Sequence, residues 1–219
     1  MAAPQYPPVY IVESPYDLYS RWNSLSPLAC REFQVGSRRS RWYSSVEHAF
    51  QVRKVSREPV RAAAFANGQQ FGQNGHPNLA ETIYRADSPE EARRIARLNE
   101  HLVPASFYQS TTENRDAPSV RLMHMILRAL CEEHWSVMDT LYRTGNGHIT
   151  LLSDDGYWGK RPSPEGDGDR NMYGKVLMEL RDRSREKWEA EQRRPAEAAA
   201  AWTRLVENDP DWVISGSSG

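Results

Sequence analysis

Cysteine is scarce in this chain, and long apolar runs are missing from it. The two cysteines, Cys30 and Cys131, match neither a zinc spacing nor a dithiol motif, and we interpret both as free thiols, with Cys131 in a helix core. No apolar stretch approaches the roughly 18 residues of a membrane span. The start, MAAPQYPPVY, lacks the pattern of a secretory signal. These absences predict an intracellular, cytoplasmic protein without a membrane partner, and they leave a nuclear location open.

Motifs for metals and for common hydrolytic reactions are also missing. The six histidines form no H-E-x-x-H pattern, and neither a nucleophile elbow nor a phosphate-binding glycine loop occurs. The acidic residues between Asp154 and Asp169 lack the spacing of a calcium loop. The sequence therefore predicts neither a metal site nor a cofactor.

Charge is nearly balanced, with 28 Lys and Arg against 29 Asp and Glu, a formal net charge of −1. The molecule as a whole therefore does not attract nucleic acid, and any such contact needs a local basic patch. Arg38, Arg39 and Arg41 form one, and arginines bind a pyrophosphate in bidentate fashion. The alternative is a solvated loop.

Residue patterning predicts one α+β domain, predominantly helical with a few short strands. We expect an irregular segment over residues 1–8, a catalytic domain over 9–188, and a helical C-terminal extension with a flexible tail over 189–219. Short strands are expected at Tyr10–Val12, Glu32–Val35 and Ile149–Leu152. Helices are expected at about 45–55, 89–98, 120–144 with a break near His134, and from Met172.

The stretch SSVEHAFQVRK, residues 44–54, holds the most informative pattern. Ser44 and Glu47 fit the S-x-x-E capping box of a helix start. On that helix Glu47, Gln51 and Lys54 lie within roughly 60° of one another, with apolar residues on both sides. A polar stripe this narrow indicates a helix that is walled in by the rest of the protein.

Glu47 and Lys54 are about 10.5 Å apart along such a helix, so they do not readily pair with each other. A furanose ring fits between them. A carboxylate stabilises the positive charge that develops when a C–N glycosidic bond breaks, and a lysine in a partly dry pocket attacks a sugar aldehyde as a neutral amine. The alternative is a capping glutamate with an ordinary surface lysine.

The stretch DGYWG, residues 155–159, is the second candidate for chemistry. Asp155 suits proton transfer, and Trp158 suits stacking on a nucleobase. The alternative is a turn aspartate followed by a tryptophan that anchors the core.

Four stretches, taken in order, resemble the signature of the NADAR family, also called YbiA-like: RWYSSVEHAFQVRK, SPEEARRIAR, LYRTGNGHITLLSDDGYWG and RNMYGKVLMELR. The resemblance covers roughly Val9 to Arg183 and implies a YbiA-like fold and an N-glycosidase. Some members resemble enzymes that split aminopyrimidine ribosyl phosphates of early riboflavin synthesis. Others remove ADP-ribose from guanine bases in nucleic acid or nucleosides.

The resemblance also implies residue roles. By this likeness Lys54 forms a Schiff base with the opened ribose, and either Glu47 or Asp155 moves protons. Trp158 matches the family's D-x-x-W-G pattern, and Asn171 matches its N-x-x-G pattern. The full set of expected substrate contacts is Tyr43, His48, Gln51, Trp158, Gly159, Asn171, Gly174, Arg38, Arg39 and Arg41.

Some positions depart from the family pattern, and they lie where a pocket rim would select the leaving group. Leu25-Ser26-Pro27 replaces an S-N-F motif, Leu130-Cys131 replaces a Lys-Phe pair, and Phe107 and Tyr108 are the nearest substitutes for a tryptophan. We therefore carry three hypotheses. The first is a glycosidase for ADP-ribosylated guanine in nucleosides or single-stranded nucleic acid. The second is a glycosidase for riboflavin precursors, and the third is a module that binds ADP-ribose or a nucleotide without turnover. The sequence identifies no protein partner.

Overall fold

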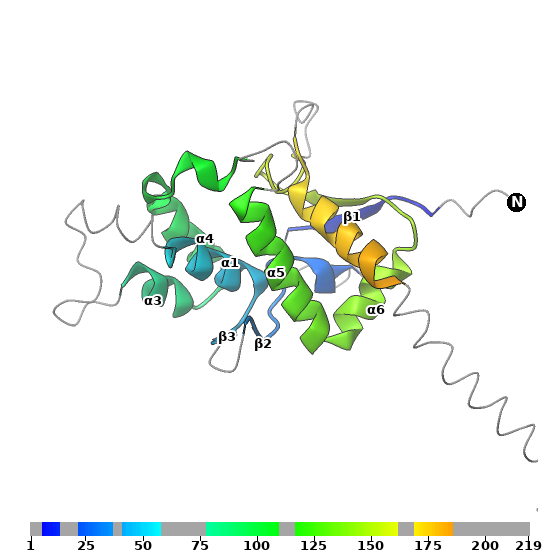
Figure 1. Cartoon of the computed structure of the whole chain (residues 1–219), viewed down its shortest axis with the longest axis horizontal. Helices are drawn as coiled ribbons and strands as arrows, with labels where there is room; N and C mark the ends of the chain where they lie inside the picture. The colour runs from blue at the N-terminus through cyan, green and yellow to red at the C-terminus, as the bar shows by residue number, and fades with distance from the viewer. Residues whose placement is uncertain are drawn as a thin grey trace, which may run out of the picture. The chain divides into compact units, whose positions relative to one another are not determined.

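The computed structural model describes residues 6–13, 22–36, 41–57, 78–109, 117–161 and 169–185 (Figure 1). The chain divides into two compact units, Met1–Leu180 and Arg181–Gly219, and apart from the end of the last helix the elements discussed below belong to the first. The expected boundary after residue 188 and the helical extension lie outside the described residues. The extension and its boundary stay predictions.

The helical part of the α+β fold is largely as the sequence predicts. Its helices are α1 (Val46–Val55), α3 (Leu79–Tyr84), α4 (Pro89–Leu98), α5 (Pro118–Glu133), α6 (Trp135–Arg143) and a last helix over 172–185. The described residues also form three short 3-10 helices: η1 (Asn23–Leu25), η2 (Glu100–Leu102) and η3 (Ala105–Phe107). The break at His134 is confirmed, whereas α3 and the 3-10 helices are not predicted from the sequence. None of the described helices combines the length and apolar composition that crossing a bilayer requires.

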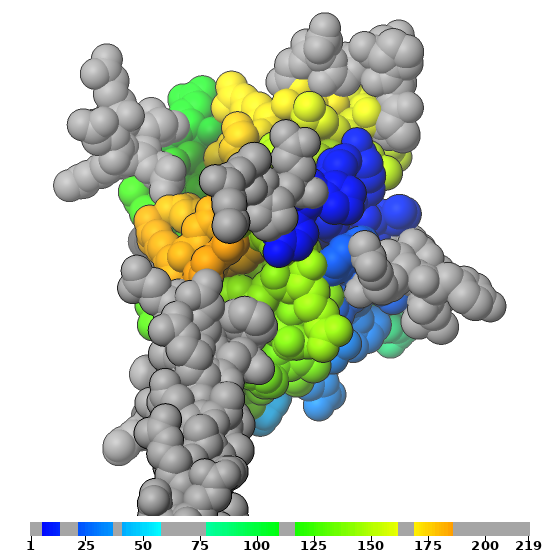
Figure 2. Space-filling view, turned by 90° about the vertical axis from the view of Figure 1, so that its right-hand side faces the viewer, coloured from blue at the N-terminus to red at the C-terminus, as the bar shows by residue number. Residues whose placement is uncertain are grey.

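The described strands form two small sheets. β1 (Val9–Val12) pairs in parallel with β4 (Ile149–Leu152), and β2 (Phe33–Gln34) pairs antiparallel with β3 (Trp42–Tyr43). Val9 and Ile11 are buried on one side of β1, while Tyr10 and Val12 are exposed on the other. Figure 2 shows the segment over residues 6–13, in dark blue, at the surface above the light green α6.

The parallel pairing of β1 with β4 positions part of the site. Because parallel strands end at the same edge of a sheet, the residues that follow β1 and β4 meet there. Glu13 follows β1, and Ser153 follows β4. The Ser153 hydroxyl donates a hydrogen bond to the Glu13 carboxylate. The same edge carries the loop that begins with Asp154 and Asp155.

Helix α1 is buried on all sides, since every residue in it except Arg53 is buried. It packs against α3, α4 and α5 (Figure 1). The predicted capping box is wrong by one position. Ser45 is the N-cap, and its hydroxyl accepts the backbone N–H of His48, so Glu47 does not cap the helix. The Glu47 carboxylate is therefore available to the candidate site and is not used at the helix start.

Candidate active site

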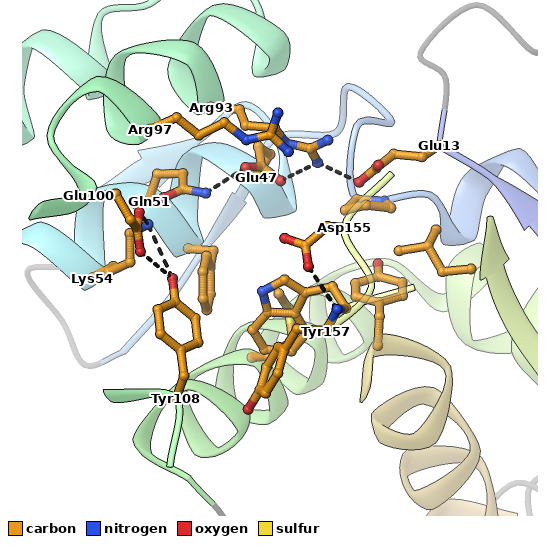
Figure 3. A pocket seen from close by; sticks show the side chains of 16 residues that line it. Glu13, Glu47, Gln51, Lys54, Arg93, Arg97, Glu100, Tyr108, Asp155 and Tyr157 are labelled. Carbon is orange, nitrogen blue, oxygen red and sulfur yellow. Dashed lines mark hydrogen bonds and ion pairs between the residues drawn. The ribbon is translucent and has the colours of Figure 1, made fainter. Parts of the chain in front are cut away.

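A cavity of about 400 Å³ lies between α1, α4, η2 and the ends of β1 and β4. Figure 3 shows its side chains. The lining residues are Glu13, Pro27, Glu47, Phe50, Gln51, Lys54, Arg93, Arg97, Glu100, Tyr108, Met123, Leu151, Asp155, Tyr157, Trp158 and Tyr173. Cavities of this size bind nucleotides and other small ligands. The narrow polar stripe of α1 therefore faces a cavity.

Both carboxylate oxygens of Glu47 have partners in the cavity wall. Its Oε2 lies 2.7 Å from Nη2 of Arg93, and its Oε1 accepts a 2.7 Å hydrogen bond from the Gln51 amide. Burial favours the neutral acid, but Arg93 and Gln51 outweigh it, so the pKa of Glu47 is lowered. The same guanidinium binds Glu13 at 2.5 Å, and these two carboxylates raise the pKa of Arg93 against the effect of its burial. Glu47 is an anion at neutral pH.

Lys54 is buried with only 2% of its surface exposed. Its Nζ lies 2.7 Å from Oε2 of Glu100 and 3.4 Å from the Tyr108 hydroxyl. That hydroxyl donates a 2.8 Å hydrogen bond to the other oxygen of Glu100. Burial, followed by the charge of Glu100, raises the pKa of Tyr108, so the phenol keeps its proton. The amine thus lies in a nearly dry pocket beside one carboxylate that accepts from two donors.

Asp155 enters the cavity from the opposite side, with its carboxylate pointing inward (Figure 3). Its Oδ1 accepts the backbone N–H groups of Tyr157, at 2.9 Å, and Trp158, at 3.2 Å. This turn fixes the carboxylate and presents both aromatic rings to the cavity. Trp158 packs edge-on against Phe50 at 5.1 Å and against Tyr157 at 5.0 Å between ring centroids. The result is an aromatic wall beside a fixed acid.

The structure thus brings together five of the expected site residues: Glu47, Gln51, Lys54, Asp155 and Trp158. The others do not line this cavity or lie outside the described residues, as Arg38 and Arg39 do. Those that do not line the cavity are Tyr43, His48, Gly159, Asn171, Gly174 and Arg41. The cavity therefore does not provide the substrate contacts expected from these six.

Arg41 and Tyr43 both contact side chains of α3, and both lie against the Tyr84 ring. Arg41 forms a 2.5 Å ion pair with Glu81 and lies over the Tyr84 ring at 5.0 Å. Tyr43 packs edge-on against the same Tyr84 ring at 6.1 Å. Contacts with α3 therefore explain the positions of both side chains.

His48 and Cys131 have core positions. The imidazole Nε2 of His48 donates to the backbone oxygen of Ala86 at 3.1 Å, and Nδ1 lies 2.9 Å from the Ser45 hydroxyl. Burial lowers the pKa of His48, which keeps it neutral. Burial raises the pKa of Cys131 to about 12, so this thiol is a poor nucleophile. Within the described ranges, no group of His, Cys, Asp or Glu side chains is arranged to hold a metal ion.

Asn171 and Gly174 hold the scaffold of the site. Asn171, at φ 48°, accepts the Leu151 N–H at 3.1 Å and donates to the Ile149 oxygen at 2.8 Å. A Cβ on Gly174 would lie 2.2 Å from that same oxygen. The N-x-x-G motif therefore fixes β4 against the start of the last helix. Similarly, a Cβ on Gly159 would lie 2.7 Å from the Leu151 oxygen.

We expect Gly174→Ala to destabilise the protein by about 1–3 kcal/mol, the usual cost of forcing extra atoms into a packed region. The methyl group meets the Ile149 backbone oxygen and the Asn171 amide, and hydrogen bonds to β4 hold that amide in place. Urea unfolding measures the loss. If the substitution leaves the unfolding midpoint unchanged, the close approach of helix and strand is wrong.

Several side chains that line the cavity are not predicted from the sequence: Glu13, Arg93, Arg97, Glu100 and Tyr157. One signal was present, because Arg93, Arg97 and Glu100 recur at helical spacing in and after SPEEARRIAR. Tyr108, noted only as a substitute for a tryptophan, lines the cavity, whereas its neighbour Phe107 is buried. The partners of Arg93 lie 46 and 80 residues away in the chain, a pairing that spacing does not predict.

Comparison with known proteins agrees with this architecture. The family model of the NADAR domain matches residues 11–185. The NMR structure of the E. coli protein YbiA is 24% identical, with a TM-score of 0.52, and the match covers 84% of this chain and 89% of that chain. At this identity the likeness shows the fold alone. No curated protein sequence matches the chain.

Proposed function

The chain belongs to the NADAR family, and from this premise we propose that it is an N-glycosidase that removes ADP-ribose from ADP-ribosylated guanine bases. The family is associated with N-glycosidase activity in general. One observation carries the proposal: Glu47 and Lys54, both almost fully buried, share one cavity with Asp155 and Trp158. Burying a carboxylate and an amine costs free energy, and a catalytic role explains why both would be retained there.

The four carboxylates of the cavity divide by their partners. Glu13 and Glu47 pair with Arg93, and Glu100 pairs with Lys54, whereas Asp155 makes no ion pair within the described residues. An anion held by arginine suits electrostatic stabilisation of the positively charged sugar that forms as the bond breaks. We therefore assign that role to Glu47. Asp155 transfers the proton to the leaving nitrogen of the base.

Lys54 must lose a proton before it attacks, because an ammonium has no lone pair. Glu100 is the acceptor in contact with it, at 2.7 Å. Tyr108 retains its own proton and cannot take this one. Glu100 accordingly accepts the proton of Lys54, and its partial exposure of 41% connects that proton to solvent.

The proposed reaction balances without a cofactor. The nitrogen of Lys54 bonds to the anomeric carbon as the bond from that carbon to the base breaks, and the base leaves with a proton from Asp155. The bonded lysine nitrogen loses a proton to the Asp155 carboxylate, its lone pair opens the ring to an imine, and Asp155 gives that proton to the ring oxygen. Water hydrolyses the imine, which releases the sugar and restores the amine.

Residues around the cavity suit a substrate with a base and phosphates. Tyr157 and Trp158 offer rings for stacking. Arg97 is exposed and lines the cavity, while Arg57 lies over Phe107 and Arg170 lies over Tyr157. Three exposed arginines near one cavity favour a diphosphate. Of these only Arg97 lines the cavity itself, and this favours a second candidate substrate with one phosphate, an aminopyrimidine ribosyl phosphate.

Incubation with ADP-ribosylated guanosine and with an aminopyrimidine ribosyl phosphate separates these functions. We expect free ADP-ribose from the first substrate, detected by chromatography, and little product from the second. Asp155→Asn, which keeps the shape of the turn, should slow the release. Cleavage of the aminopyrimidine substrate alone would move the assignment to the second candidate. Tight binding of ADP-ribose without product from either substrate would identify a binding module and refute the proposal.

A further inference from the structure

Gln51 carries an unused polar atom inside the cavity. Its side chain is buried, with 7% of the residue exposed, and it lines the cavity between Glu47 and Lys54 on α1. Within the described part of the chain, Oε1 of Gln51 is buried and has no hydrogen-bond partner. Buried polar atoms are almost always paired, so an unpaired one that faces a cavity points to a ligand.

The orientation of the Gln51 amide follows from its neighbour. Amide oxygen and nitrogen atoms are assigned from the hydrogen bonds they make. Glu47 is ionised and accepts hydrogen bonds only, so the NH2 group of Gln51 must face it, at 2.7 Å. The opposite end, left free, is the carbonyl oxygen. The cavity therefore offers an acceptor at this point, and its ligand must bring a donor.

We propose that Gln51 Oε1 accepts a hydrogen bond from the hydroxyl on the sugar carbon next to the scissile carbon, so that the site selects ribose over 2-deoxyribose. This inference rests on the proposed function, in which Lys54 bonds to the anomeric carbon. Gln51 precedes Lys54 by three residues, so both side chains leave the same face of α1. The hydroxyl on the adjacent carbon is the substrate donor nearest to that bond.

The leaving base is a less suitable partner for this atom. An amine attacks the anomeric carbon from the face opposite the departing base. Gln51 lies on the same helix as the amine, while Tyr157 belongs to the loop that brings Asp155 into the cavity from the opposite side. Gln51 therefore faces the sugar, and the aromatic wall faces the base.

The test compares two substrates, ADP-ribosylated guanosine and its counterpart with 2-deoxyribose at the scissile bond, by their kcat/KM values. Glycosides of 2-deoxyribose hydrolyse faster even without an enzyme. The informative quantity is therefore the change in the ratio of the two kcat/KM values between wild type and variant. We expect Gln51→Met to lower the preference for ribose by about 10- to 100-fold, the usual effect of one buried hydrogen bond. Gln34→Met, at a glutamine in β2 that does not line the cavity, should leave the ratio unchanged.

Gln51→Met also removes the hydrogen-bond donor to Glu47. We expect that loss to slow both substrates by the same factor, so that it cancels in the ratio of their kcat/KM values. An unchanged ratio in Gln51→Met would overturn the inference even if the glycosidase activity is real.

Binding measurements separate failure of this inference from failure of the proposed function. Calorimetry compares ribose 5-phosphate with 2-deoxyribose 5-phosphate on protein carrying Lys54→Met, which cannot form an imine. At least about 10-fold tighter binding of the ribose compound, lost when Gln51→Met is added, would support the hydroxyl site without any turnover. Equal binding, or no binding of either sugar, would refute it. The comparison of the two sugars on the Lys54→Met protein needs no substitution at Gln51. It is therefore informative even if the Gln51→Met variant fails to fold.

Discussion

Replacing Lys54 with methionine should abolish both turnover and covalent trapping. With ADP-ribosylated guanosine as substrate, borohydride should link the sugar to wild-type protein, because reduction converts a lysine imine into a stable amine. The Lys54→Met variant should give no adduct, and its kcat should fall on the order of 10⁴-fold or more, as when an enzyme loses its nucleophile. Mass spectrometry of the intact protein measures the adduct, and release of ADP-ribose measures turnover.

The control for this substitution is Lys175→Met, at an exposed lysine of the last helix. It should trap the sugar as the wild type does. Methionine preserves most of the volume of Lys54 and leaves Glu100 partly exposed to water, so folding should persist. An adduct that survives in Lys54→Met would assign the imine to another amine and would remove Lys54 from the mechanism.

The part of the site on α1 is predictable from the sequence because it is local. Glu47, Gln51 and Lys54 share a face through helix geometry alone, and the apolar residues beside them indicate burial. The error at the cap has a local cause too. Two adjacent serines, Ser44 and Ser45, offer two N-caps, and in the structure it is Ser45 that accepts the His48 N–H.

The rest of the site depends on pairings across the chain. Glu13 reaches the cavity because β1 pairs in parallel with β4, some 140 residues away, and short strands carry too little pattern to predict a partner. The family motifs also mix two kinds of residue. Asp155 and Trp158 reach the cavity, whereas Asn171 and Gly174 fix the backbone that positions them. Motif membership alone does not separate these roles.

Arg93→Met should be the most destabilising substitution near the site. Arg93 lies between Glu13 and Glu47, at 2.5 and 2.7 Å, and its side chain is 18% exposed. Removing one partner of a buried ion pair leaves an uncompensated charge and typically costs about 3–5 kcal/mol. Urea unfolding at neutral pH should show this loss. Arg94→Met, whose guanidinium pairs with Glu91 on the exposed face of α4, should change stability little.

The pH dependence of this loss distinguishes a charge effect from a packing effect. In the wild type the folded-state pKa of Glu47 is lowered, so its contribution to stability is complete above its unfolded pKa, about 4.5, and declines as the pH falls through the folded pKa. Without Arg93, burial dominates and raises the pKa of Glu47 above the unfolded value. The buried anion then destabilises the variant at neutral pH, and protonation relieves this on acidification. The stability gap between wild type and Arg93→Met should therefore narrow between pH 7 and about pH 4.5, and adding Glu47→Gln should close much of it at pH 7. A gap that stays constant with pH, and that Glu47→Gln does not reduce, would mean that Arg93 supports the fold by packing and not by holding Glu47 as an anion.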